Sequence, residues 1–130
     1  MRQMAIWIDH QEAHVFHVTD ATFDEVTVSS PPHHLHRHPR NQETKIRNHP
    51  QDESRFFDDV VHALAGAQEI LIMGPSVTKL RFFRYAQQQV PGVASHVVGM
   101  ESADHPTDRQ LIAHIRDYFH GERPSLDLAP

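Results

Sequence analysis

The sequence predicts an α/β fold in which a mixed sheet of antiparallel and parallel strands is covered by helices. Two observations support this. The first thirty residues form three short runs of apolar and polar residues separated by polar turns, a pattern typical of an antiparallel meander. Beyond residue 50 the apolar spacing becomes helical, and helical segments alternate with short apolar runs.

Three strands are expected in the first part of the chain. Residues 4–8 (MAIWI) form the first and end at Asp9, residues 13–18 form the second, and residues 23–29 form the third. The polar segments between them are short enough for tight connections between neighbouring antiparallel strands.

The helical pattern starts after residue 50, with Asp52 or Ser54 as candidate N-cap and Gly66 as the stop signal. One apolar face is spaced for a helix and consists of Phe56, Phe57, Val60, Val61 and Leu64. Residues 69–73 (EILIM) are almost wholly apolar and predict a central strand that is buried on both faces.

The rest of the chain predicts two more helices and one more strand. Ser76 is the candidate N-cap of a helix that ends at Pro91, and residues 93–100 predict a strand. A last helix begins at residues 106–108 and is stopped by Gly121. The order of three strands, a long loop and then α-β-α-β-α matches the ribonuclease H-like architecture.

Length and composition favour one domain over residues 1–120, followed by a tail at 121–130. The absence of cysteine excludes disulfides, thiolate zinc sites and cysteine nucleophiles, and it fits a reducing compartment. No run approaches the ~20 apolar residues of a membrane span, and the N-terminus lacks the apolar length of a signal peptide. We therefore expect a soluble cytoplasmic protein, with no cofactor and an undetermined oligomeric state.

Residues 31–50 (PPHHLHRHPRNQETKIRNHP) form the predicted long loop, which we call the basic segment. It contains four basic residues and one acidic residue, a net charge of +3, whereas the whole chain carries −5 and the remainder therefore −8. Lys/Arg clusters of this kind are typical of nucleic-acid contacts. The basic residues that would contact RNA phosphates are Arg37, Arg40, Lys45 and Arg47. The alternative is a solvated loop without a partner.

The basic segment also holds clustered histidines, which suggest a metal-binding alternative through neutral imidazole. The candidates are His33, His34, His36 and His38. Neighbouring histidines on a loop lose conformational entropy when they bind an ion, and no thiolate is available, so adventitious binding is the simpler interpretation.

The segment GPSVTK at residues 74–79 lies between a predicted strand and a predicted helix, a place where an anion can bind. It lacks the second glycine of a Walker loop, and an ordinary turn explains it equally. Lys79, Arg81 and Arg84 would form a basic strip on the following helix, and Lys79 and Arg84 are the weaker RNA-binding candidates.

Asp9 supports a further alternative, a metal-dependent nuclease, because a ribonuclease H-like fold can hold a metal-binding carboxylate at that position. Such an enzyme needs several converging carboxylates. The candidates are Glu69, Glu101, Asp104 and Asp108. Asp104 and Asp108 also flank a helix start, where acids cap free N–H groups, and Asp9 also fits a turn. We favour these structural interpretations.

The segments AIWIDHQEAHVFHV, GPSVTK and HPTD resemble small bacterial translational machinery proteins, which are similar to the middle domain of class-1 release factors and of Pelota. The resemblance covers about residues 4–120. It implies a ribonuclease H-like fold without nuclease activity and a role on the ribosome or with tRNA.

Release factors of this kind carry a Gly-Gly-Gln motif in the corresponding long connection, and this chain does not. The basic segment has no glycine, and its only glutamine, Gln42, stands between Asn41 and Glu43. Hydrolysis of peptidyl-tRNA is therefore not implied. Pelota-like proteins also lack the motif, so the resemblance implies a non-catalytic module that binds ribosomal or transfer RNA.

Overall fold

The computed structural model describes residues 2–19, 21–30 and 42–121, with the side chains of residues 42–51 left out. In these ranges the strands are β1 (Gln3–Ile8), β2 (Glu12–Val18), β3 (Phe23–Ser29), β4 (Glu69–Gly74) and β5 (Val97–Ser102). The helices are α1 (Gln42–Ala63), α2 (Thr78–Gln89), α3 (Pro91–Ala94) and α4 (Asp108–His120). Every helix among these residues is too short or too polar to span a bilayer.

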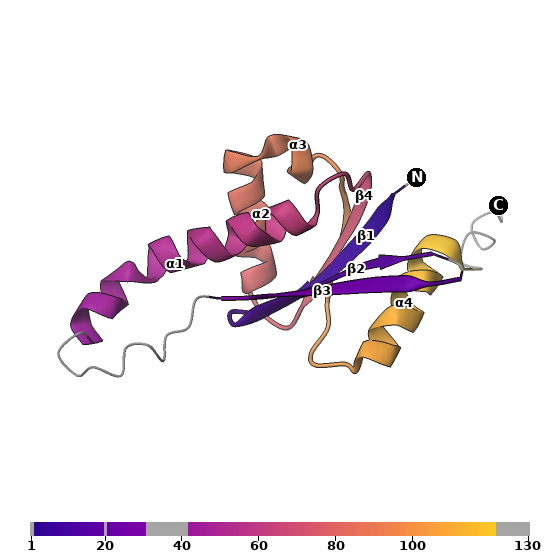
Figure 1. Cartoon of the computed structure of the whole chain (residues 1–130), viewed down its shortest axis with the longest axis horizontal. Coiled ribbons are helices and arrows are strands. Elements are labelled where there is room, and N and C mark those ends of the chain that lie inside the picture. Colours follow the sequence, from indigo (N-terminus) through magenta and orange to yellow (C-terminus); the bar gives the residue numbers. More distant parts are fainter. Residues whose placement is uncertain (1, 20, 31–41, 122–130) are drawn as a thin grey trace.

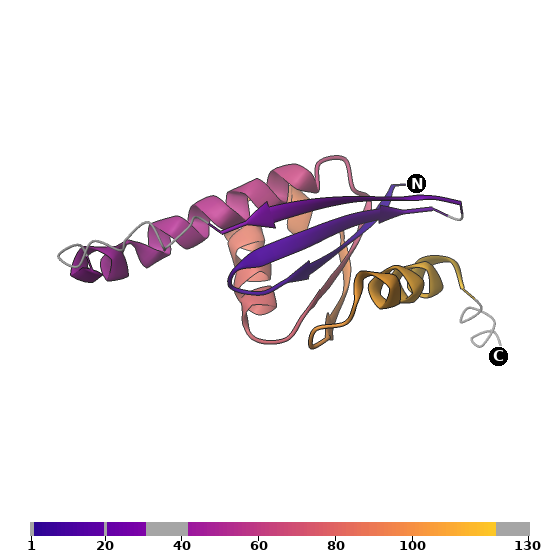
Figure 2. The same ribbon diagram turned by 60° about the horizontal axis from the view of Figure 1, so that its bottom comes forward.

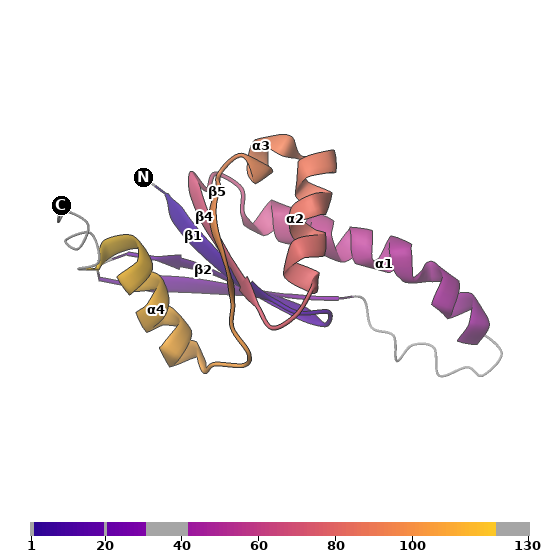
Figure 3. The same ribbon diagram turned by 180° about the vertical axis from the view of Figure 1, so that it is seen from behind.

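The five strands form one mixed sheet in the order β3-β2-β1-β4-β5 (Figure 3). The first three strands pair antiparallel, whereas β4 pairs parallel with both β1 and β5. The predicted meander and the predicted mixed α/β fold are therefore confirmed. The first strand of the chain lies at the centre of the sheet.

Helices cover both faces of this sheet, with α1 and α2 on one side and α4 on the other (Figures 1 and 2). Alternate residues of β1 serve the two sides: Ile6 packs in the cluster with α1 and α2, and Trp7 packs in the cluster with α4. Since side chains of a strand point alternately to opposite faces, a strand covered on both sides must be apolar throughout. This explains the uninterrupted apolar runs in β1 and β4.

Helix α1 starts far earlier than expected, at Gln42, so the predicted loop at residues 31–50 is wrong over its second part. Asp52 and Ser54, the predicted N-caps, lie inside the helix. Pro50 argues against a helix here, because proline inside a helix costs about 3 kcal/mol. The residues before it include good helix formers such as glutamine, glutamate, lysine and arginine. The first turns of α1 extend away from the sheet (Figure 1).

Two boundaries after β4 also differ from expectation. The N-cap of α2 is Val77, without a side-chain cap, and not Ser76. The predicted strand over 93–100 starts only at Val97, because Pro91 opens the short helix α3. Proline suits the first turn of a helix, where its fixed φ is favourable and its missing N–H is not needed.

Helix α4 has a complete capping box, in which Thr107 is the N-cap and Gln110 its reciprocal partner. The Gln110 backbone N–H donates to the Thr107 hydroxyl at 3.1 Å, and the Thr107 backbone N–H donates to the Gln110 side chain at 2.8 Å. The cap is thus supplied by Thr107 and not by the acids proposed from the sequence. Asp108 occupies the first turn, and Asp104 lies outside the helix.

Candidate functional site

The basic residues predicted to contact RNA fall into three groups. Arg37, Arg40 and the four candidate histidines (His33, His34, His36 and His38) lie outside the described residues. Lys45 and Arg47 belong to the first turns of α1, which project from the sheet. Lys79 and Arg84 lie on α2, the second helix over the sheet.

The predicted basic strip on α2 does not form as a continuous surface. Lys79 is only 9% exposed, and its ammonium donates a 2.7 Å hydrogen bond to the Ser76 carbonyl. Two guanidinium nitrogens of Arg81 bind the Glu53 carboxylate on α1, and this pairing raises the Arg81 pKa. Arg84 is exposed and makes no hydrogen bond or ion pair with a described residue. The ammonium of Lys79 therefore stabilises the turn that precedes α2.

Asp9 closes the turn between β1 and β2. One oxygen of its carboxylate, Oδ1, accepts the backbone N–H groups of Gln11 and Glu12, both at 2.9 Å. The Asp9 N–H in turn donates to the Glu12 carbonyl at 3.0 Å. The interpretation of Asp9 as a turn residue is confirmed.

The carboxylates proposed to join Asp9 in a nuclease site do not gather around it. Glu69 lies opposite Gln3, at the other end of β1. Glu101 instead pairs with a histidine of α4. The exposed Asp104 reaches Asp9 only through the ring of His105, whose Nδ1 lies 3.1 Å from Asp104 and whose Nε2 lies 3.7 Å from Asp9. Among the described residues, the one group that could hold a metal ion does not include Asp9. A two-metal mechanism needs converging carboxylates, and the described residues do not place them around Asp9.

A different polar cluster forms where β2, β3 and the start of α4 meet. It consists of Glu12, His14, Glu25 and Asp108, and we call it the His14 cluster. The His14 Nδ1 atom lies 2.9 Å from a Glu25 oxygen, and its Nε2 atom lies 3.1 Å from a Glu12 oxygen. Asp108 approaches from α4, so that ligand atoms of His14, Glu25 and Asp108 all lie within 4.8 Å of one another.

His14 was not among the candidates taken from the sequence, although part of the signal was present. Glu12 and His14 are two residues apart on one strand and share a face. The position of Glu25 depends on the pairing of β2 with β3, in which His14 lies opposite Thr27. The position of Asp108 depends on how α4 crosses the sheet.

The neighbours of His14 raise its pKa. Burial lowers the pKa, but hydrogen bonds to Glu25 and Glu12, with their negative charges, outweigh burial, and the pKa lies above its ordinary value of 6.5. A group whose pKa is higher in the folded state stabilises the fold fully below its unfolded pKa. That contribution disappears as pH rises through the raised folded pKa.

We therefore expect the destabilisation caused by His14→Asn to be largest below pH 6.5 and to shrink at higher pH. The free energy of unfolding should be measured by urea titration over a pH series in metal-free buffer. His10→Asn, at an exposed position in the adjacent turn, is the matched control and should show no such dependence. A pH-independent effect of His14→Asn would contradict this account.

Trp7 lies beside the His14 cluster. Its ring centre lies 6.0 Å from that of His14 and 5.0 Å from that of His105. Its indole N–H donates a 3.1 Å hydrogen bond to the Ala103 carbonyl in the connection before α4. Trp7 is 4% exposed and lies on the central strand. Its hydrogen bond to Ala103 therefore links the centre of the sheet to the connection that leads to Asp108.

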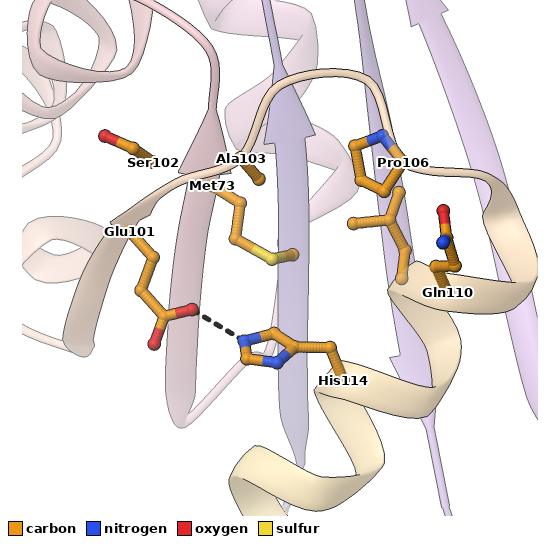
Figure 4. A pocket seen from close by; sticks show the side chains of 8 residues that line it. Met73, Glu101, Ser102, Ala103, Pro106, Gln110 and His114 are labelled. Atoms are coloured by element: carbon orange, nitrogen blue, oxygen red, sulfur yellow. Dashed lines mark hydrogen bonds and ion pairs between the residues drawn. The ribbon is translucent and has the colours of Figure 1, made fainter.

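A pocket of about 330 Å³ lies between β5 and α4, with Met73 at its base (Figure 4). At its mouth the His114 Nε2 atom lies 2.6 Å from a Glu101 oxygen. Ser102 points away from this pair (Figure 4). A histidine–carboxylate pair needs a neighbouring nucleophile to perform covalent catalysis, and the residues that line this pocket do not provide one.

No protein-family model and no curated protein matches this chain. Several solved structures, however, are similar to it. Pelota from Archaeoglobus fulgidus is 12% identical with a TM-score of 0.63, and the match covers 91% of this chain and 31% of that protein. Pelota from Thermoplasma acidophilum is 23% identical with a TM-score of 0.59, over 92% of this chain and 32% of that one. The chain has a Pelota-like fold.

The archaeal translation termination factor aRF1 shares this Pelota-like fold, at 10% identity and a TM-score of 0.51 over 82% of this chain. The chain spans about a third of the length of each of these proteins. The sequence resemblance to the middle domain of release factors and Pelota is thus confirmed at the level of the fold. The Pelota-like fold includes the ordered sheet and the helices that support the His14 cluster.

Proposed function

We propose that this chain is a non-catalytic, translation-associated module that contacts ribosomal or transfer RNA through its basic segment, residues 31–50. The observation that carries the proposal is the Pelota-like fold, shared with a translation termination factor, combined with the projection of α1. The first turns of α1 hold Lys45 and Arg47 and extend beyond the sheet (Figure 1), where a large RNA surface can approach them.

The charge distribution supports the same contact. The basic segment carries +3, and the rest of the chain carries −8. A phosphate backbone attracts the former and repels the latter, so the contact is confined to one part of the molecule and its orientation is fixed. On the body, Arg84 is an exposed cation that could extend the contact. Lys79 is not, because its ammonium is held by the Ser76 carbonyl.

The proposal predicts salt-sensitive co-sedimentation with ribosomes that is lost when Arg37, Arg40, Lys45 and Arg47 are changed to glutamate. Four phosphate contacts give a slope near −3.6 in a plot of log K against log salt, so affinity should fall about a hundredfold between roughly 50 and 200 mM salt. Circular dichroism should show an intact fold in the variant, since none of the four residues belongs to the two hydrophobic clusters of the described residues.

A pair of double variants separates local charge from total charge. Lys45→Glu with Arg47→Glu changes the projecting turns of α1, whereas Arg55→Glu with Arg109→Glu makes the same change in net charge at exposed positions elsewhere. We expect the first pair to weaken binding strongly and the second pair only slightly. Two outcomes would show that the basic segment is not the contact: an equal loss of affinity in both double variants, or wild-type affinity in the variant that carries all four substitutions. Absence of wild-type binding at low salt would overturn the translation role.

A further inference from the structure

We propose that His14, Glu25 and Asp108 bind one divalent transition-metal ion, with Zn²⁺ as the preferred ion. The site would join β2, β3 and α4 and would be distinct from the histidines of the basic segment. This inference rests on the described residues of the His14 cluster and does not depend on the proposed function.

The three residues come from separate elements that the fold holds together. One candidate ligand atom of each lies within 4.8 Å of the others. Ligands around Zn²⁺ lie about 2.0–2.2 Å from the ion, which requires separations of roughly 3.3–3.5 Å between them. His14 Nδ1 and Glu25 lie 2.9 Å apart, a hydrogen-bond distance, so the ion would replace the shared proton and these two atoms would move roughly 0.5 Å further apart. Asp108 is exposed, so a rotation of its side chain can close the remaining distance.

Glu12 supplies a second feature that is typical of metal sites. Histidines that bind metals usually donate the N–H of their other ring nitrogen to a carboxylate, which fixes the tautomer and the ring orientation. Here Nδ1 faces Glu25, and Nε2 lies 3.1 Å from Glu12. The ring is therefore held with one nitrogen toward the proposed ligand set and the other on a carboxylate.

The charge of the cluster also favours a bound cation. Three carboxylates, those of Glu12, Glu25 and Asp108, surround one imidazole, so the net charge is negative in either protonation state of His14. Asp108 is not needed for the helix cap, which Thr107 and Gln110 complete. No lysine or arginine of the described ranges forms an ion pair with these carboxylates.

The ligand types favour Zn²⁺ over Mg²⁺ or Ca²⁺. Imidazole suits zinc and neighbouring transition metals, whereas Mg²⁺ and Ca²⁺ prefer sites composed of oxygen atoms. Three protein ligands leave a position for water, an arrangement that zinc commonly adopts. Because the ion would connect two strands to α4, its expected consequence is a more stable contact between the sheet and that helix.

The test uses the full chain with all five histidines of the basic segment changed to asparagine, so that the segment contributes no imidazole ligand; these are His33, His34, His36, His38 and His49. Calorimetric titration with ZnCl₂ after chelator treatment should show one ion bound. Co²⁺ should quench the fluorescence of Trp7, the only tryptophan in the chain, because its ring lies 6.0 Å from His14.

Asp108→Asn in this background should abolish binding, whereas Asp59→Asn, at an exposed carboxylate on α1, should leave it unchanged. Glu12→Gln should weaken binding about tenfold to a hundredfold, the usual effect of losing a carboxylate that orients a ligand histidine. Asp108 is exposed, so its variant should fold normally. Absence of Zn²⁺ binding by the background protein, or equal binding by Asp108→Asn, would overturn the proposal.

Discussion

Replacing Trp7 with alanine is expected to lower the free energy of unfolding by about 3–5 kcal/mol, the usual cost of removing a buried aromatic side chain. Trp7 is 4% exposed and packs in the cluster beneath α4. Its indole N–H also bonds the Ala103 carbonyl. The variant therefore leaves both a cavity and an unpaired carbonyl. Urea unfolding followed by circular dichroism measures the loss, since the variant has no tryptophan.

Trp7→Phe separates packing from hydrogen bonding. Phenylalanine retains an aromatic ring but cannot donate to Ala103, so we expect a smaller loss of about 1–3 kcal/mol. The same variant tests whether the indole N–H helps to position the segment that leads to Asp108. If both variants unfolded like the wild type, Trp7 would not be the link between the sheet and α4 that the structure indicates.

Replacing Gly74 with alanine is expected to cost on the order of 3 kcal/mol, because the new methyl group would overlap the main chain of β1. A Cβ atom at this position would lie 2.3 Å from the Ile8 carbonyl oxygen. Main-chain atoms of a central strand cannot move aside without disturbing the pairing of β1 with β4. Thermal or urea unfolding should reveal the loss.

Gly92→Ala provides the matched control, because a Cβ atom there would meet no heavy atom within 4 Å. Gly92 lies in the short helix α3, and alanine favours a helix by up to about 1 kcal/mol. We expect a stability equal to or slightly above that of the wild type. Similar losses in both variants would mean that the contact with Ile8 does not decide the role of Gly74.

The sheet could be predicted from the sequence because its strands leave strong local signals. Strands covered on both faces are apolar throughout, and the turn residues between them stand out. The first turns of α1 leave no such signal. They extend from the body, so no apolar face marks them, and Pro50 argues against a helix.

The sites were harder to predict because they depend on contacts between distant segments. Glu25 reaches His14 through the register of β2 and β3, and Asp108 arrives through the crossing of α4. The burial of Lys79, in contrast, could have been predicted from the sequence. Lys79 lies three positions before Phe82 and seven before Ala86, both buried, so its helical spacing already placed it on the packed face.

The position of β1 at the centre of the sheet has a consequence for biosynthesis. A nascent chain emerges with β1, β2 and β3 first, and the partner of the free edge of β1 is β4, which ends at Gly74. Because synthesis adds roughly 5–20 residues per second, the N–H and C=O groups of that edge stay unpaired for a few seconds. An exposed apolar strand edge can pair with strands of other chains. Early folding of this protein thus includes a short interval in which it is open to aggregation and to chaperones, and completion of β4 closes that interval.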